Sequence, residues 1–409
     1  MPVRRHHTDI LIAALALVGV TGCGRFGFGD DAPIDAAPDV MPDTPVAIEP
    51  MELAITQTFV TAQTTFVDIP AATLTLPASP GTSWLVLTSA KLASPTFSAQ
   101  SVEARYLLDD VELGMGGTQT STPGFPGPWQ HFVVIAGTTA PQQLRYQLRD
   151  VSAAGAILEA LTVEAIPFAA ADVAYASNDP VHDVTAVAAT ADSVLSLGPL
   201  SGDYVFFLVA NTTDLPGESD CYVQWMGPNG ATWMRDSQQP RESWQSFMTV
   251  QRGSFDIVAA HVTLLTHVGS GPCQVRNVRA AAIPTSAFAS VDYARNDDAT
   301  LVNATATPAT TVTLTPMPSS ATQFLFWGNA MLDEDCLTVA DAQRTVVFTH
   351  GSTTESISHA TDNCSYTATY GHVALLPSAP SSMSIGFSSG SGAGGVDHYA
   401  SELMLLGLR

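Results

Sequence analysis

The chain is poor in charge, and above all in positive charge. Charged residues make up 13% of its 409 residues, with 15 basic against 38 acidic side chains, and Lys91 is the single lysine. No cluster of Lys and Arg interrupts this negative balance, so the phosphate-neutralising patch that nucleic-acid binding requires is missing. We therefore expect no nucleic-acid partner, and we expect anionic membrane surfaces to repel the chain.

Long helical periodicity and long apolar runs are also scarce. The most extended apolar run, Ile10 to Val20, is far shorter than the ~20 residues that a membrane-spanning helix needs. Only Ala156 to Ala165 could form a helix by its pattern, and its place at the end of a repeat favours a closing strand. Because 46% of the residues are hydrophobic, the chain still has enough apolar surface for folded cores.

The start of the chain has the pattern of an export leader. Two arginines precede the apolar run, and Val20-Thr21-Gly22-Cys23 places small residues before a cysteine. This string resembles the lipobox of bacterial lipoproteins. The resemblance implies a signal peptide at 1–22, a lipid-modified Cys23 and attachment to the membrane through the lipid. Gly24, which is not Asp, favours the outer over the inner membrane.

Residues 23–50 are predicted to be a disordered tether. Five prolines and six acidic residues lie between Gly24 and Pro50. Proline stiffens such a segment and like charges extend it, so the tether would hold the folded part away from the bilayer.

An internal repeat of about 118 residues fills the rest of the chain. Its landmarks are Tyr175 to Asp179, which returns as Tyr293 to Asp297, and the apolar runs that begin at Trp84, Tyr204 and Gln323. We place the three repeats at 51–168, 169–286 and 287–409. Each has the size of a domain that folds alone, so we expect three separable modules.

Each repeat is predicted to be an antiparallel β-sandwich. In Val102 to Tyr106 and Leu144 to Arg149, apolar and charged residues alternate as in half-buried strands. An Asn-Gly pair between Trp225 and Trp233 predicts a hairpin. Many short strands separated by turn residues indicate an all-β fold of three tandem sandwiches. Jelly-roll connectivity is preferred over immunoglobulin-like connectivity.

Four cysteines remain besides Cys23. Disulfides persist in an exported protein, and four cysteines allow three connectivities. Sequence order and the repeat boundaries favour the pairs Cys221 with Cys273 and Cys336 with Cys364. A zinc site is disfavoured because no two of these cysteines have the C-x2-C spacing.

Acidic residues gather just before the first cysteine of each pair. The candidate calcium ligands are Asp214, Asp220, Asp333 and Asp335, because loop carboxylates are the oxygen ligands that calcium accepts. Neither segment has the fixed spacing of an EF-hand, so solvated loops are favoured. No other metal or cofactor is expected.

Histidines and tryptophans supply the other candidate site residues. His350, His359 and His372 are interpreted as scattered surface imidazoles in preference to a metal site. Trp233 is the candidate for an exposed position that stacks on a sugar ring, whereas most of the other tryptophans fit a core. The Asn-Asp pairs of the repeated landmark are predicted to be turn residues.

No catalytic motif stands out. Gly386 to Gly390 matches the G-x-S-x-G pattern of α/β-hydrolases, but a glycine-rich loop follows it where that chemistry needs a helix. We expect a lipid-anchored, non-enzymatic protein with a binding, adhesion or envelope-structural role and a glycan or envelope protein as partner. The alternative is a secreted hydrolase that acts on polysaccharide with carboxylates in a cleft between domains.

Overall fold

The computed structural model of the chain describes residues 48–409 apart from short gaps. The gaps are 96–99, 121–126, 152, 185–191, 215–218, 228–229, 236–243, 267–272, 298–299, 303–307, 335–341, 362–367 and 390–395. The described part from Ile48 onward is one compact unit. The predicted signal peptide, lipobox and most of the tether lie outside the described residues. Within the described ranges, no helix has the length and apolarity needed to cross a membrane.

The described residues fold into strands joined by turns and two short 3-10 helices. Repeat one contains β1 (Met51–Ile55), β2 (Phe59–Thr61), β3 (Val67–Leu76), β4 (Thr82–Ala93), β5 (Gln100–Leu108), β6 (Val111–Thr120), β7 (Gly127–Ala136), β8 (Gln142–Asp150) and β9 (Ala156–Ala169). Repeat two contains β10 (Ala174–Asn178), β11 (His182–Val184), β12 (Asp192–Leu197), β13 (Tyr204–Asp214), β14 (Ser219–Gly227), β15 (Gly230–Arg235), β16 (Gln245–Gly253), β17 (Val258–Thr266) and β18 (Cys273–Pro284). Repeat three contains β19 (Ser290–Asn296), β20 (Thr300–Val302), β21 (Ala309–Leu314), β22 (Phe324–Glu334), β23 (Ala342–His350), β24 (Thr353–Thr361), β25 (Ala368–Leu376), β26 (Met383–Ser389) and β27 (Val396–Gly407). The 3-10 helices η1 (Ala170–Asp172) and η2 (Thr285–Ala287) follow β9 and β18.

The order of strands is the same in all three repeats. In repeat one, the inner sheet has the order β1-β9-β4-β7 and the outer sheet has the order β3-β8-β5-β6. The inner sheets β10-β18-β13-β16 and β19-β27-β22-β25 repeat the first order, and the outer sheets β12-β17-β14-β15 and β21-β26-β23-β24 repeat the second. The pairs within each sandwich are antiparallel, and the chain crosses repeatedly between the two sheets. This is jelly-roll connectivity, so the predicted fold class is confirmed.

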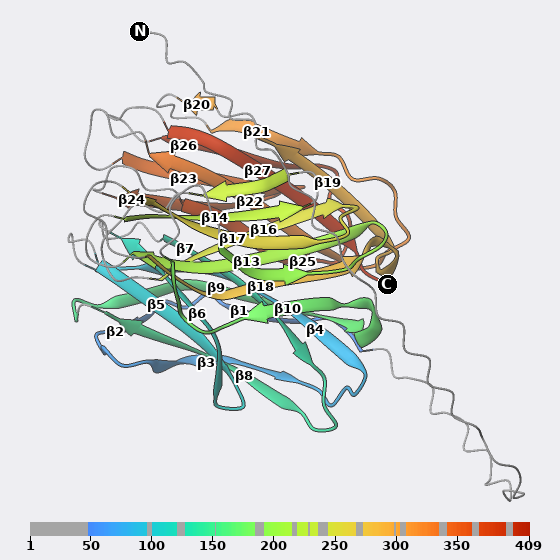
Figure 1. The fold of residues 1–409 in the computed structure, drawn as a ribbon, viewed down its shortest axis with the longest axis horizontal. Helices are drawn as coiled ribbons and strands as arrows, with labels where there is room; N and C mark the ends of the chain where they lie inside the picture. The colour runs from blue at the N-terminus through green and yellow to red at the C-terminus, as the bar shows by residue number, and fades with distance from the viewer. Residues whose placement is uncertain are drawn as a thin grey trace, which may run out of the picture. The chain divides into compact units, whose positions relative to one another are not determined.

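Predicted local features are found within these sheets. The segment Ala156 to Ala165 is part of strand β9. Trp225 pairs with Trp233 across the β14–β15 hairpin, as the Asn-Gly signal predicts. Figure 1 shows the repeats as successive colours, from blue through green and yellow to red.

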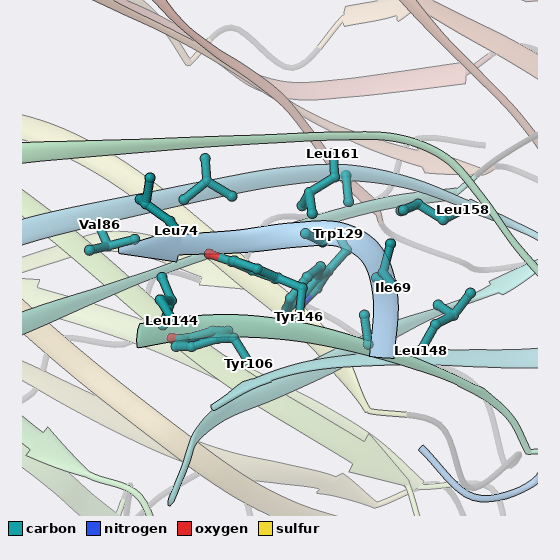
Figure 2. Close-up of a cluster of buried hydrophobic side chains, with 14 of the residues drawn as sticks. Ile69, Leu74, Val86, Tyr106, Trp129, Leu144, Tyr146, Leu148, Leu158 and Leu161 are labelled. Atoms are coloured by element: carbon teal, nitrogen blue, oxygen red, sulfur yellow. The ribbon is translucent and has the colours of Figure 1, made fainter. Parts of the chain in front are cut away.

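Each sandwich has its own apolar core. In repeat one, the rings of Tyr106, Trp129 and Tyr146 pack among aliphatic side chains from both sheets, as Figure 2 shows. The indole of Trp84 is fully buried, and its Nε1 donates to the Ser79 hydroxyl at 2.9 Å. The buried Tyr146 hydroxyl lies 2.8 Å from the Thr88 hydroxyl, which satisfies both groups inside the sandwich.

The three repeats also share a core. Side chains on the other face of each inner sheet form one cluster, in which Leu87, Phe207 and Trp327 come from repeats one, two and three. Phe132 of β7 contacts Phe207 of β13, with ring centres 6.1 Å apart. Each repeat therefore buries apolar surface against both of the others. An isolated repeat would expose its part of this apolar cluster to water. We therefore no longer expect the three repeats to be separable folding units.

Candidate functional site

The most unusual surface is the solvent face of the outer sheet of repeat one. In strands β5 and β8, the side chains of Val102, Ala104, Leu144 and Leu148 point into the core. Successive side chains of a strand point to opposite faces of the sheet, so the charged residues between them share the other face. We name this surface the charged face. It consists of Phe66, Asp68, Glu103, Arg105, Asp110, Glu112, Arg145, Gln147 and Arg149.

Ion pairs and hydrogen bonds cross the charged face from strand to strand. Arg149 donates from Nε to Glu103 Oε2 at 2.7 Å, and Arg105 donates from Nη1 to Glu112 Oε2 at 2.9 Å. Arg105 Nε also donates to Gln147 Oε1 at 2.7 Å. Glu103 is 1% exposed although it points away from the sandwich core, because neighbouring groups cover it.

The same network continues to strand β3. Gln147 Nε2 donates to Asp68 Oδ1 at 2.8 Å, and Arg145 Nη1 donates to Asp68 Oδ2 at 3.0 Å. Arg145 also pairs with Asp110 in the β5–β6 turn. Exposed ion pairs of this kind contribute only about 0 to 1 kcal/mol each.

An aromatic ring lies within the charged face. The guanidinium carbons of Arg105 and Arg149 are 4.2 and 4.6 Å from the ring centre of Phe66. These cation–π contacts hold the two arginines in position. The face therefore presents fixed donors, acceptors and one ring, which suits a ligand with many hydroxyl groups.

The charged face adjoins the second repeat. Strand β6 forms one parallel pair with β16, between Gly117 and Gln245, which joins the outer sheet of repeat one to the inner sheet of repeat two. A Cβ at Gly117 would lie 3.1 Å from the carbonyl oxygen of Trp244 and 2.5 Å from that of Val102. The absence of a side chain at Gly117 allows the two repeats to approach this closely.

Other charged groups form buried links between repeats. Arg279 of repeat two donates to Asp179 at 2.8 Å and to the Tyr106 hydroxyl of repeat one at 2.9 Å. The Tyr106 hydroxyl also lies 2.6 Å from His131 Nδ1. Burial, and then the positive charge of Arg279, hold the pKa of His131 well below its usual value, so this imidazole is neutral. We interpret this network as structural because its centre is inaccessible.

Two carboxyl groups are buried between repeats. The Thr249 hydroxyl of repeat two donates to Glu402 Oε2 of repeat three at 2.9 Å, and burial raises the pKa of Glu402 to about 7. The backbone N–H of Leu375 in repeat three donates to Glu164 Oε1 of repeat one at 3.2 Å. Burial, and then the charge of Glu52, raise the pKa of Glu164 to about 8. Both carboxyl groups are fully buried, so they are not in an open cleft as the hydrolase alternative requires.

The interpretation of the histidines as scattered surface groups is wrong for two of them. His350 and His372 face each other inside repeat three, with ring centres 5.8 Å apart and ring planes 13° apart. Burial lowers the pKa of both, to about 4 for His372, so both rings are neutral near pH 7. The side chain of His359 lies outside the described residues. In the described part of the chain, no group of three His, Cys, Asp or Glu side chains is arranged to hold a metal ion.

The predicted cysteine and calcium sites are described only in part. Cys221 lies in β14, and Cys273 pairs with Asp214 at the end of β13, the strand before β14. Both cysteines therefore lie near one end of the second sandwich, in different sheets. The side chains of Cys221, Cys273, Asp214, Asp220, Asp333 and Trp233, and all of Cys23, Asp335, Cys336 and Cys364, lie outside the described residues. The disulfide, calcium and stacking assignments remain predictions.

The G-x-S-x-G match is part of a strand as far as Ser389, where the described segment ends. Phe387 packs into the core of repeat three, and Ser388 pairs with Thr345 of β23. This geometry is not the sharp turn that a nucleophilic serine needs.

Two surface hollows of similar size lie in the described part of the chain. One, of about 290 Å³, lies where the repeats end and is lined by Ile48, Phe168, Asp172, Ala287 and Arg409 among others. The second, of about 320 Å³, lies beside β1, β2 and β3 and has no ionisable side chain in its lining. Neither combines an acid and a base with a nucleophile, so neither is favoured as a catalytic site.

Comparison with known proteins finds structural matches at low sequence identity. No family model matches the chain, and no curated protein matches it. A structure of PNGF-II covers 56% of this chain and 60% of its own length, at 9% identity and a TM-score of 0.22. The tandem CBM22 domains of Paenibacillus barcinonensis Xyn10C cover 57% and 93%, at 9% identity and a TM-score of 0.19. A triple jelly-roll protein of an archaeal virus covers 86% and 82%, at 10% identity and a TM-score of 0.18.

These likenesses are too low to carry a functional argument. The chain spans 60% of the length of the PNGF-II structure. What defines the class of this protein is its own strand order, which makes it a tandem triple jelly-roll protein.

Proposed function

We propose that the protein is a lipid-anchored envelope protein that binds carbohydrate through its first jelly roll and does not catalyse a reaction. The observation that supports this most is the charged face, where planar guanidinium, carboxylate and amide groups surround Phe66. Such groups donate to and accept from sugar hydroxyls, and their mutual bonds hold them in position before a ligand arrives. Adhesion and envelope-structural roles would use the same surface.

Glycan-array binding of residues 48–409 tests this function. The double variant Arg105→Ala, Arg149→Ala should lose at least tenfold in binding, because each arginine supplies charge-assisted hydrogen bonds and covers Phe66. Arg252→Ala is the matched control, since Arg252 pairs with Asp203 at 3.0 Å on another part of the molecule. Equal binding by wild type and double variant would remove the charged face as the site.

Anchoring is tested separately. Cys23→Ser removes the thiol that the lipobox resemblance implies is lipidated, so the variant should leave the membrane fraction or fail to mature. Unchanged partitioning into the detergent phase would contradict the proposed anchor.

The alternative function is hydrolysis of a polysaccharide. It would need two carboxylates in a cleft between domains. Release of new reducing ends from a polysaccharide would support it. Binding without any release of reducing ends favours the non-catalytic function.

A further inference from the structure

Repeat one lacks a hydrogen bond that repeats two and three share. In repeat two, the Asn178 amide at the end of β10 donates to the Val194 carbonyl oxygen at 2.7 Å. In repeat three, the Asn296 amide at the end of β19 donates to the Thr311 carbonyl oxygen at 2.8 Å. Ile55 is the corresponding last residue of β1, which pairs with β9 as β10 pairs with β18 and β19 with β27. Because isoleucine has no side-chain donor, repeat one cannot form this bond.

The following short strand differs in the same way. His182 begins β11 of repeat two, and its Nε2 lies 2.7 Å from Asn178 Oδ1. Phe59 begins β2, the corresponding strand of repeat one, and packs against the core of that repeat together with Ile55. Repeat one therefore has two apolar side chains where repeat two has a pair of hydrogen-bonded polar ones.

The edge strand of the outer sheet is also wider here in repeat one. Strand β12 of repeat two has a bulge of one residue, Val194. In β3, the pairing with β8 is interrupted between Asp68 and Thr73, so Ile69 to Ala72 form a longer bulge. Ala71 in this bulge has a φ of 62°, in the left-handed region that residues with a side chain rarely adopt. The longer bulge takes the place of the segment that the asparagine holds in the other repeats.

A hollow of about 320 Å³ lies at this position. Its lining comes from the end of β1, the start of β2, the turn between them and the β3 bulge. The buried part of the lining is apolar and includes Ile69, which lies in the core of repeat one (Figure 2). The exposed part bears the hydroxyl and amide groups of Thr56 to Thr58, and the lining has no ionisable side chain. An apolar hollow of this size with a few polar groups is typical of small-molecule sites.

The hollow adjoins the charged face through β3. Asp68 belongs to the charged face, where it accepts from Arg145 and Gln147, and the next residue, Ile69, begins the bulge. Other residues of the bulge are exposed. A saccharide chain that lies on the charged face can therefore extend into the hollow.

We propose that this hollow is a subsite for one uncharged pyranose unit, and that the asparagine bond closes the corresponding place in repeats two and three. The apolar lining covers the C–H face of the sugar ring, and the exposed hydroxyl and amide groups bond its hydroxyls. A carboxylate on the ring would lose water without gaining a cation. This inference rests on the proposed carbohydrate-binding function. It adds the position of the subsite, one site per chain and selectivity for neutral units.

A glycan array tests the selectivity on the full chain in detergent. The probes are neutral glucan, mannan and galactan oligosaccharides, beside the same oligosaccharides oxidised to uronates at C6. Wild type should retain at least one neutral probe and bind its uronate form at least about tenfold more weakly, a difference of about 1.4 kcal/mol. Titration calorimetry with the retained probe should give one site per chain.

Two variants test the position. Thr58→Trp fills the hollow from its exposed side and should weaken binding of the neutral probe at least about tenfold. Its matched control is Val181→Trp, because Val181 is 49% exposed and directly precedes β11 as Thr58 directly precedes β2. This control should bind as wild type does. Gln57→Ala removes an exposed amide and should weaken binding about fivefold. A thermal melt of each variant shows whether a loss reflects unfolding.

The outcomes separate this inference from the function on which it rests. Equal binding of neutral and uronate probes by wild type, unchanged binding in Thr58→Trp, or more than one site per chain overturns the subsite. Carbohydrate binding then stands, and the Arg105→Ala, Arg149→Ala variant decides whether the charged face alone provides it. An array that retains no probe overturns both. If Thr58→Trp melts below wild type, unchanged binding in Gln57→Ala overturns the subsite instead.

Discussion

At the scale of single residues, the repeated Asn-Asp landmark has a structural role that its sequence does not reveal. The sequence predicts Asn178 and Asn296 to be turn residues, whereas each is the last residue of a strand, β10 or β19. Their side-chain amides donate to the carbonyl oxygens of Val194 and Thr311 at 2.7 and 2.8 Å. In both repeats, the same residue therefore ties the inner sheet to the start of the outer sheet.

Removal of these amides should destabilise the fold. Asn178→Ala and Asn296→Ala should each lower the free energy of unfolding by about 1 kcal/mol, because a partly buried carbonyl loses its donor. Urea unfolding of residues 48–409 measures the change. The exposed strand residue Thr75, changed to Ala, serves as the control. An unchanged free energy of unfolding in both Asn variants would show that these side-chain hydrogen bonds do not contribute to stability.

The buried carboxyl groups predict how stability depends on pH. The pKa of Glu164 rises from 4.5 to about 8 in the folded chain. A raised pKa means that the fold favours the protonated form, so its stabilising contribution is full below pH 4.5 and is lost as pH rises to about 8. Glu164→Gln mimics the protonated carboxyl and should raise stability at pH 9 by about 2 kcal/mol relative to wild type. Denaturant midpoints at pH 6 and 9 measure this, and a parallel decline in both proteins would contradict it.

At the scale of elements, the glycines of β6 decide how two sheets meet. A Cβ at Gly117 would lie 2.5 Å from the Val102 carbonyl oxygen, which belongs to the neighbouring strand and cannot move aside cheaply. Gly117→Ala should cost about 1 to 3 kcal/mol and weaken the β6–β16 junction. Hydrogen exchange of the β16 amides reports that junction. Unchanged protection there would mean that the two sheets are held together by other contacts.

At the scale of the whole molecule, the shared core predicts a single cooperative unfolding transition. Residues 169–286 expressed alone would expose Phe207 and Val209, and residues 287–409 would expose Trp327. We therefore expect these fragments to aggregate or to melt far below the intact chain. Calorimetry of the intact chain should give one transition. Three independent transitions, and stable separate fragments, would support the separable modules expected from the repeat.

The pairing of the four cysteines tests how the second and third repeats are divided. Non-reducing peptide analysis should link Cys221 to Cys273 and Cys336 to Cys364. The positions of Cys221 and Cys273 near one end of the second sandwich agree with the first link. A crosslink between the second and third repeats would contradict the assigned pairs.

The strand content, the repeat and much of the core can be predicted from the amino-acid sequence alone. Alternation in Val102 to Tyr106 is enough to assign a half-buried strand, because side chains on a strand point to opposite faces by geometry alone. The burial of Trp84, Trp129 and Trp327 follows in the same way from the apolar runs around them. Local patterns record these features, since each depends on near neighbours in the chain.

The packing of the repeats and the clustering of charged side chains follow from the three-dimensional fold. Glu103 and Arg149 are 46 residues apart, and they meet because β5 pairs with β8. Gly117 meets Trp244 through the pairing of β6 with β16 from two repeats, and His350 meets His372 through the two sheets of one sandwich. Contacts between distant segments follow from strand register and sheet packing. Neither is recorded in a local sequence pattern, so the charged face could not be recognised as one surface before the fold was known.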